Sequence, residues 1–230
     1  MKILALCDNL LDVIRFESSF ASGQINYLIC NNSRKNNTAT ILNQIILLPK
    51  FRMKEIYTIF NLYLEGLIKF SNKDINSNVV NSWITKNNFD IGLHSMGVIY
   101  KKSLINSFNI GILNSHIGKL PEMRGRCVFE WSLINDTPIG ITCFFIDAGI
   151  DTGSRIVLFS PQKVDKDLNI SKNKLFQLDV FIYKTAIDLI NSGSQFTPNN
   201  ISLGLRYYVM SNLFKSALND CMKDNVSNVY

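Results

Sequence analysis

The sequence has few of the residues from which metal centres and disulfide frameworks are built. It contains two histidines, His94 and His116, among 230 residues, and no C-x-x-C pair. The five cysteines are Cys7, Cys30, Cys127, Cys143 and Cys221. Their odd number and wide spacing argue against a structural zinc site and a disulfide framework. We therefore expect a reducing, cytoplasmic setting and no metal.

The sequence also lacks long apolar runs. The opening apolar stretch ends at Asp8, too soon for a signal peptide, and no stretch approaches the roughly 18 apolar residues of a membrane span. Hydrophobic residues nevertheless make up 47% of the chain and charged residues 18%, the balance of a packed globular protein. The sequence predicts a soluble protein with no membrane partner.

The sequence also lacks a glycine-rich phosphate-binding loop. No G-x-G-x-x-G follows the first apolar stretch and no Walker A motif occurs, so a dinucleotide or ATP cradle is not expected. The net charge of +6 favours an anionic partner, but the lysines are dispersed. Two interpretations stay open: a solvated basic surface, or a site for a small phosphorylated ligand. No stripe typical of tRNA binding is present, so no nucleic-acid partner is expected.

Short apolar segments alternate with segments of helical periodicity. The predicted strands are residues 2–7, 27–30, 89–97, 111–114, 140–147 and 155–160, with a strand or hairpin at 201–210. The predicted helices are residues 10–20, 54–70, 78–88, 98–108, 127–136 and 171–193 and a final amphipathic helix, and a polar loop is predicted at 31–40. This alternation predicts an α/β fold with a doubly wound, mainly parallel, Rossmann-like sheet. Residues 1–160 would form the core, and residues 161–230 a small C-terminal extension of helix and β-hairpin packed on it.

Ligands of such sheets bind at the carboxyl ends of the strands, here the loops after Cys7, Leu93, Asn114 and Ile146. Asn114 and His116 stand two apart at a predicted strand end, so their side chains share a face. The amide of Asn114 can donate to a developing oxyanion, and His116 can act as a base near neutral pH. Alternatively, Asn114 caps the turn and His116 is hydrogen-bonded in the core.

The segment IDAGIDTG at 146–153 places two carboxylates, Asp147 and Asp151, in a glycine-bearing loop. A carboxylate at Asp151 can orient His116 and favour its protonated form. Alternatively, Asp151 belongs to an Asx-turn or a helix cap before the next strand.

Taken together, three elements resemble the formyltransferases that use 10-formyltetrahydrofolate. They are Asn114-Ser-His116, the turn Leu120-Pro-Glu-Met-Arg-Gly125, and Asp151-Thr-Gly153, with Asp151 following His116 by 35 positions. Order and spacing match the family pattern of Asn-x-His, Leu-Pro-x-x-Arg-Gly and Asp-Thr-Gly. The resemblance covers roughly residues 1–160.

The resemblance implies that a primary amine attacks the formyl carbon through a tetrahedral intermediate. Asn114, His116 and Asp151 would be the catalytic residues. His116 would take the proton of the amine, Asn114 would hydrogen-bond the oxyanion, and Asp151 would orient His116.

By the same resemblance, 10-formyltetrahydrofolate would be the formyl-donating cosubstrate, without a metal. Its pterin would lie against the main chain of two loops, with contacts expected from His94, Met96, Gly97, Val98, Ile99, Asp147, Gly149 and Ile150. His94 could instead be a buried structural histidine.

Further resemblance bears on the acceptor amine. The first-strand loop, Cys7-Asp-Asn-Leu-Leu-Asp12, has no glycine, unlike the phosphate loop of formyltransferases of purine synthesis. The segment after residue 160 looks too short for the extra barrel domain of enzymes that formylate initiator tRNA. Gly125-Arg-Cys-Val-Phe-Glu-Trp131 and Gly204-Leu-Arg-Tyr-Tyr-Val-Met210 resemble the branch that formylates amino sugars on nucleotide carriers. Ser211 departs from that branch, where a histidine is frequent.

We therefore expect a homodimer that formylates a nucleotide-linked amino-dideoxy sugar, with dTDP-4-amino-4,6-dideoxyglucose as the best guess, for surface polysaccharide (O-antigen) synthesis. Substrate contacts are expected from Asp8, Asn9, Lys119, Arg124, Arg126, Glu130 and Tyr207. Ordinary interpretations stay open: Lys119 as a solvent-exposed charge, Glu130 as part of an amphipathic helix, and Tyr207 as a packing or dimer contact. The alternative functions are formylation of methionyl-tRNA or a ribonucleotide amine, and a catalytically silent folate- or nucleotide-binding module.

Overall fold

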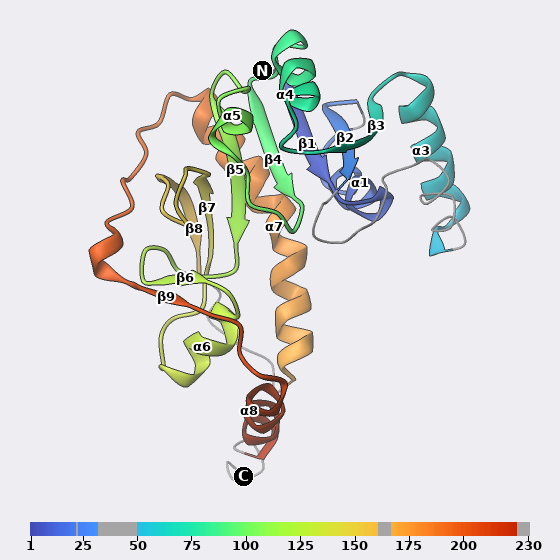
Figure 1. The fold of residues 1–230 in the computed structure, drawn as a ribbon. Coiled ribbons are helices and arrows are strands. Elements are labelled where there is room, and N and C mark those ends of the chain that lie inside the picture. The colour runs from blue at the N-terminus through green and yellow to red at the C-terminus, as the bar shows by residue number, and fades with distance from the viewer. Residues whose placement is uncertain (22, 32–49, 161–166, 225–230) are drawn as a thin grey trace. The chain divides into compact units, whose positions relative to one another are not determined.

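The computed structural model describes residues 1–21, 23–31, 50–160 and 167–224 (Figure 1). The chain divides into two compact units, Met1–Asn114 and Ser115–Tyr230, and each is described by itself. The polar loop predicted at 31–40 lies outside the described residues, except for its first residue. Within the described ranges, no helix has the length and apolar character needed to cross a membrane.

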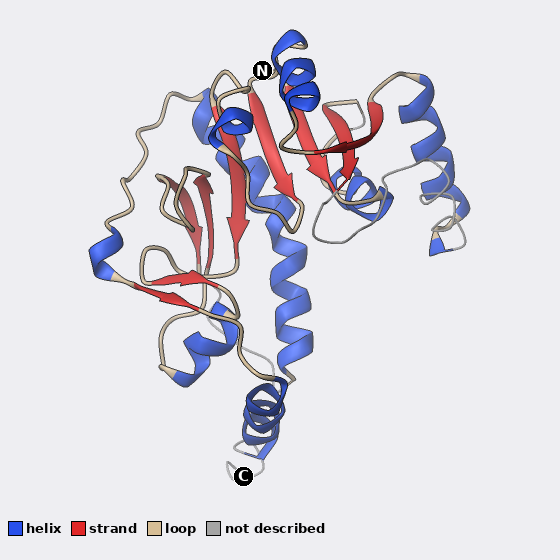
Figure 2. Cartoon of the chain, viewed as in Figure 1, coloured by secondary structure: helices blue, strands red, loops and turns tan. Residues whose placement is uncertain are grey.

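Parallel strands form the centre of the first unit. They are β1 (Ile3–Cys7), β2 (Ile25–Asn31), β3 (Ile68–Asp74), β4 (Ile91–Ser95) and β5 (Gly111–His116), whose last two residues open the second unit (Figure 2). β1 pairs in parallel with β2 and β4, β2 with β3, and β4 with β5. Every residue of β1 is buried, which explains why its sequence, ILALC, is apolar throughout.

The second unit contributes β7 (Ile141–Phe145) and β8 (Arg155–Phe159), which pair antiparallel. The strand order of the sheet is β3-β2-β1-β4-β5-β7-β8. An antiparallel edge strand on an otherwise parallel sheet is common in doubly wound folds. The predicted α/β fold with a mainly parallel sheet is confirmed.

Helices connect the strands of the first unit: α1 (Leu10–Glu17), α3 (Met53–Leu64), α4 (Asn78–Lys86) and α5 (Lys102–Ile105). α1 follows β1 closely because Asn9 caps it. The Asn9 side chain accepts a hydrogen bond from the Leu11 amide at 2.8 Å, and the Asp12 carboxylate accepts one from the Asn9 amide at 3.3 Å. Side chains therefore fix the first strand-to-helix turn without a glycine.

The helix predicted at residues 54–70 is shorter in the structure. α3 ends at Leu64, and the chain then enters β3. Gly66 has a φ of +74°, the left-handed conformation that commonly ends a helix. The apolar spacing continued past this glycine, which is why it misled the prediction. The helix expected at 98–108 is likewise reduced to the single turn α5.

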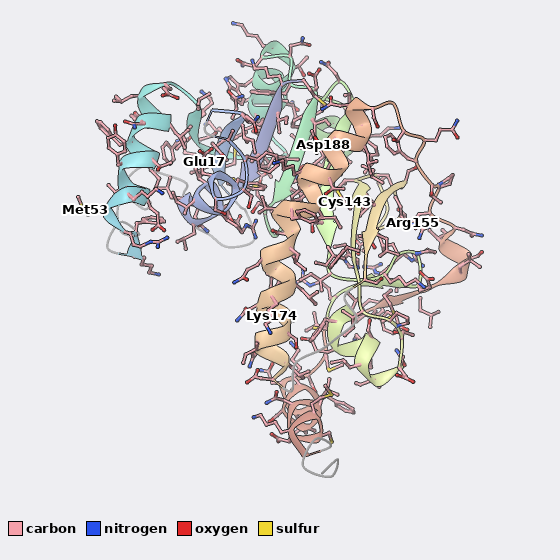
Figure 3. The ribbon with its side chains drawn as sticks, turned by 180° about the vertical axis from the view of Figure 1, so that it is seen from behind. Glu17, Met53, Cys143, Arg155, Lys174 and Asp188 are labelled. Atoms are coloured by element: carbon pink, nitrogen blue, oxygen red, sulfur yellow. The ribbon has the colours of Figure 1, made fainter. Side chains whose placement is uncertain are left out.

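The remaining elements of the second unit are β6 (Met123–Gly125), α6 (Val128–Ile134), α7 (Leu168–Asn191), a 3-10 turn (Ile201–Leu203), β9 (Leu205–Tyr207) and α8 (Asn212–Asp224). α7 packs against β7 and β8 and buries Val180, Tyr183 and Ile187 at helical spacing. Figure 3 labels Cys143 on β7, Arg155 on β8 and Lys174 on α7.

β9 does not form the β-hairpin that was expected. It pairs in parallel with β6, with Met123 opposite Leu205 and Gly125 opposite Tyr207. A hairpin needs an adjacent antiparallel strand, but a 3-10 turn precedes β9 and α8 begins at Asn212. The hairpin part of the predicted extension is therefore wrong, whereas its helices are present. The grouping of residues 1–160 as core and 161–230 as extension stays a prediction.

Burial predicts which of the five cysteines react. Cys7, Cys30 and Cys143 are buried, and burial raises the pKa of each thiol, that of Cys30 to about 12. Cys127 is half-buried and Cys221 is exposed. Because the thiolate is the reactive form, we expect an aromatic disulfide reagent at about pH 8 to label only Cys127 and Cys221 in the native protein. Mass spectrometry counts the labels, and denatured protein, with all five labelled, is the control. A third labelled thiol in the native protein would contradict the described core.

Candidate active site

Strand β5 carries Asn114 and His116 two positions apart, so that their side chains leave the same face of the strand. His116 is 8% exposed, whereas Asn114 is half-buried. The imidazole ring meets the ring of Phe144 edge-on, with 6.5 Å between the centroids. The histidine therefore stands in a largely apolar setting, and its two nitrogens face the polar partners described next.

One nitrogen of His116 is held by the main chain. Nε2 lies 2.8 Å from the carbonyl oxygen of Met123. A carbonyl only accepts hydrogen bonds, so Nε2 carries a proton and donates it. In the neutral ring Nδ1 is then the nitrogen with a free lone pair.

Asp151 faces the other nitrogen. Its Oδ2 lies 3.7 Å from Nδ1 of His116, within ion-pair distance but longer than a hydrogen bond. A proton taken up at Nδ1 would therefore place a positive charge beside a carboxylate. This arrangement suits a base that gains a proton during the reaction.

The position of Asp151 is fixed by its backbone and by two neighbours. Its φ is +54°, its Oδ2 accepts a hydrogen bond from the Gly125 amide at 2.8 Å, and its carbonyl accepts one from Nδ2 of Asn199 at 3.3 Å. Gly153 follows in the same turn, where a Cβ would lie 1.7 Å from the carbonyl oxygen of Phe145. The Asp-Thr-Gly turn therefore requires its glycine for close backbone packing.

The turn between β5 and β6 is also built around His116. A Cβ on Gly118 would lie 2.6 Å from Nε2 of His116. The fully buried Thr142 donates to the carbonyl of Gly118 at 2.7 Å and accepts from the amide of Leu120 at 3.1 Å. Nη1 of Arg155 donates to the Leu120 carbonyl at 2.7 Å. The turn is thus anchored from β7 and β8.

Several of these positioning residues were missed by the analysis of the sequence. They are Gly118, Thr142, Arg155 and Asn199. Gly118 had a usable signal, because a glycine two positions after a candidate base allows close backbone approach. The other three carry no pattern that separates them from ordinary polar residues.

Of the three predicted cationic ligand contacts of the second unit, Arg124 and Lys119 have side-chain contacts with protein groups. Nη2 of Arg124 donates to the carbonyls of Ile201 and Gly204 at 3.3 and 3.2 Å. Nζ of Lys119 lies 3.0 Å from the carboxylate of Glu122. Arg126 is exposed, and its amide donates to the carbonyl of Tyr207 at 3.1 Å. Their roles in substrate binding stay predictions.

Glu130 and Tyr207 are engaged as well. Glu130, on α6, is 5% exposed and its Oε1 lies 2.6 Å from Nζ of Lys172 on α7. The hydroxyl of Tyr207 accepts from Nδ2 of Asn135 at 3.2 Å, and its ring lies against Trp131. Both contacts are compatible with the ordinary packing roles, and substrate contact stays a prediction for both.

The predicted contacts on the first unit occupy the ends of β1 and β4. Asp8 and Asn9 form the turn into α1, where the Asp8 amide donates to Asp12 at 3.0 Å. Burial raises the pKa of the Asp12 carboxyl.

Nδ1 of His94 lies 2.8 Å from the hydroxyl of Tyr100. After β4, Met96 is buried, Val98 is half-buried, and Gly97 and Ile99 are exposed.

The predicted folate contacts of the second unit lie in the loop after β7. Oδ1 of Asp147 accepts from the Gly149 amide at 3.0 Å and from the Thr152 hydroxyl at 2.5 Å. Asp147 and Gly149 are exposed, and Ile150 is half-buried. Asp147 therefore shapes its own loop as an Asx-turn. In the described part of the chain, no group of three or more His, Cys, Asp or Glu side chains is arranged to hold a metal ion.

The contact between His116 and Met123 can be tested with Gly118→Ala, because the added Cβ would also lie 2.7 Å from the Met123 carbonyl oxygen. In the wild-type protein we expect ¹⁵N NMR to show neutral His116 protonated at Nε2. The variant should populate the other tautomer. Gly193→Ala is the control, because a Cβ there meets no atom within 4 Å, and the strain of its φ of +72° affects stability only. Neutral His116 protonated at Nδ1 in the wild type would overturn the assignment.

Comparison with known proteins gives sequence matches over part of the chain, among them several methionyl-tRNA formyltransferases. No family model matches. Over 101 residues, or 43% of the chain, the sequence is 35% identical to methionyl-tRNA formyltransferase of Geobacter sulfurreducens. The match covers 32% of that protein, so the chain matches about a third of the length of such curated relatives.

Solved structures match over nearly the whole chain. A 4-N formyltransferase from Francisella tularensis has a TM-score of 0.62 and 19% identity, over 95% of this chain and 85% of that one. The formyltransferase PseJ from Anoxybacillus kamchatkensis, solved with UDP-4,6-dideoxy-4-formamido-L-AltNAc and tetrahydrofolate, has a TM-score of 0.56 and 21% identity, over 91% and 86%. The resemblance that the sequence motifs indicated is confirmed, and this chain has the fold of the formyltransferases.

Proposed function

We propose that this protein transfers a formyl group from 10-formyltetrahydrofolate to the primary amine of a nucleotide-linked amino sugar. The observation that carries the proposal is the geometry at the end of β5. There Nδ1 of His116 faces Asp151 at 3.7 Å, with Asn114 two residues earlier on the same strand. A base with a carboxylate beside it and a neighbouring amide are the groups that acyl transfer to an amine requires.

In the proposed reaction, 10-formyltetrahydrofolate supplies the electrophilic formyl carbon. Nδ1 of His116 takes the proton that the attacking amine loses, while Nε2 stays bonded to Met123. The side-chain amide of Asn114 donates to the formyl oxygen as negative charge develops on it. The Asp151 carboxylate stabilises the imidazolium, which then returns the proton to the departing N10 of the folate.

The loops after β4 and β7 contain exposed glycines, whose main-chain groups are accessible to a pterin. A pterin presents a flat edge of hydrogen-bond donors and acceptors, which main-chain groups can bind. Gly97 and Gly149 are exposed and carry no side chain to cover the backbone beside them. The predicted contacts of His94, Met96, Ile99 and Ile150 belong to the same proposal.

The solved neighbours support an amino sugar as acceptor. One is named as a 4-N formyltransferase, and another was solved with a UDP-linked formamido sugar. Our best guess for this chain remains dTDP-4-amino-4,6-dideoxyglucose, formylated in the cytoplasm for surface polysaccharide synthesis. The net charge of +6 is compatible with a pyrophosphate-bearing substrate.

A homodimer is part of the proposal. Apolar side chains stand exposed along the C-terminal segment, which is the usual mark of an interaction surface. They are Leu203, Leu205, Tyr208, Val209, Leu213 and Phe214. Sedimentation equilibrium tests this part separately from the chemistry.

Methionyl-tRNA is the second candidate acceptor. The observation that favours it is the 35% identity to a methionyl-tRNA formyltransferase. That similarity covers 43% of this chain, whereas the structures of the 4-N formyltransferase and of PseJ each match more than nine-tenths of it. The donor chemistry is common to both candidates.

A turnover assay distinguishes the candidates. The protein is incubated with 10-formyltetrahydrofolate and, separately, with dTDP- and UDP-linked amino sugars, methionyl-tRNA and a ribonucleotide amine. Mass spectrometry detects the gain of one formyl group. We expect a formylated amino sugar. Formylated methionyl-tRNA would favour the second candidate, and folate binding without any product would favour a silent binding module.

Replacement of the base tests the proposed chemistry. We expect His116→Asn to lower kcat by about 10²- to 10⁴-fold, the usual contribution of a general base. Folate binding, measured by calorimetry, should persist because the pterin contacts are elsewhere. Retention of wild-type kcat would remove His116 from the reaction.

Replacement of the amide tests the oxyanion contact. We expect Asn114→Ala to lower kcat by about 10²- to 10³-fold, as for other oxyanion donors. Asn109→Ala is the matched control, because Asn109 is an exposed asparagine just before the other end of β5 and donates to Asn88 and Asp90. Equal effects of the two substitutions would contradict the role of Asn114.

A further inference from the structure

A buried tyrosine on α7 holds the main chain of β5 between the two candidate catalytic residues. The amide of Ser115 donates a hydrogen bond to the hydroxyl of Tyr183 at 2.9 Å. Tyr183 is 1% exposed. The amide that it holds belongs to the peptide bond between Asn114 and Ser115, so it lies between the proposed oxyanion donor and the proposed base.

β5 lies between β4 and β7 in the strand order, and its pairing with β4 stops before this point. The described register joins Ile91 to Gly111 and Leu93 to Leu113, and it goes no further along β5. The last three residues of β5, Asn114–His116, extend past that register. In a parallel sheet the neighbouring strand normally fixes each peptide plane through its hydrogen bonds. For the peptide before Ser115, the tyrosine hydroxyl accepts the hydrogen bond instead.

The orientation of this peptide sets how Asn114 and His116 stand to each other. A change in ψ of Asn114 or φ of Ser115 that the other angle does not compensate turns the side chain of Asn114 relative to that of His116. The hydrogen bond to Tyr183 restrains the peptide plane that both angles share. Reacting groups must be held within about 0.5 Å of the productive geometry.

We propose that Tyr183 is a positioning residue of the formyl-transfer site, acting through the Asn114–Ser115 peptide. The inference rests on the proposed function for its effect on turnover. Its effect on the geometry of His116 does not depend on that function.

Tyr183→Phe removes the hydroxyl and keeps the ring. We expect kcat to fall by about 10-fold, less than the loss that full misplacement of a reacting group causes. KM for folate and acceptor should stay within about twofold, because uniform binding is unchanged.

Tyr27→Phe is the matched control. Tyr27 is also buried, and its hydroxyl donates to Glu17 at 2.5 Å within the first unit. Both variants lose one buried hydrogen bond, so both should unfold at lower urea concentration. Only Tyr183→Phe should lower kcat.

An NMR measurement keeps the inference testable if no acceptor is turned over. His116→Asn assigns the signals of the two histidines. We expect Tyr183→Phe to shift the imidazole signals of His116 and leave those of His94 in place, whereas Tyr27→Phe should leave His116 unchanged. Where the wild type is active, a wild-type kcat in Tyr183→Phe, or an equal loss in Tyr27→Phe, overturns the inference. Where it is inactive on every acceptor, the proposed function fails, and an unshifted His116 signal overturns this inference separately.

Discussion

The hydrogen bond from Nε2 of His116 to the Met123 carbonyl is the contact on which the candidate site depends. This hydrogen bond occupies Nε2 with the main chain. It leaves Nδ1, which faces Asp151, as the nitrogen that can take up a proton. The other neutral tautomer, protonated at Nδ1, would set a bare Nε2 against the carbonyl oxygen, two acceptors without a proton between them. The turn after β5 presents that carbonyl, and Gly118 leaves room for it.

Many polar side chains of the second unit donate hydrogen bonds to main-chain carbonyls of the same unit. Arg124 and Arg155 donate to carbonyls, and Asn199 donates to the carbonyl of the residue that supplies the carboxylate. Each such bond contributes about 1 kcal/mol, or more where the donor is charged. Together they fix the Leu-Pro-x-x-Arg-Gly turn and the Asp-Thr-Gly turn around one histidine.

The features that could be predicted from the sequence are those that a local pattern of residues determines. The apolar run of β1, the strand alternation and the two-residue spacing of Asn114 and His116 are such patterns. The partner of His116 could not be predicted, because a main-chain carbonyl leaves no mark on residue type. Tyr183 lies 68 positions from the amide that it holds, and Asn199 lies 48 positions from Asp151, so no local signal identifies either. The misjudged end of α3 differs, because Gly66 was a local signal that the apolar spacing concealed.

The distances along the chain at which these contacts are made decide when the site is completed during synthesis. Met123 follows His116 by seven positions, whereas Asn199 follows Asp151 by 48. Because a ribosome releases the chain from its N-terminus, the histidine can find its carbonyl early. Of the two supports of Asp151, Gly125 precedes it in the chain, whereas Asn199 is synthesised 48 positions after it. A polypeptide that ends before Asn199 can therefore form the contact between His116 and Met123, but it lacks the hydrogen bond that Asn199 donates to the Asp151 carbonyl.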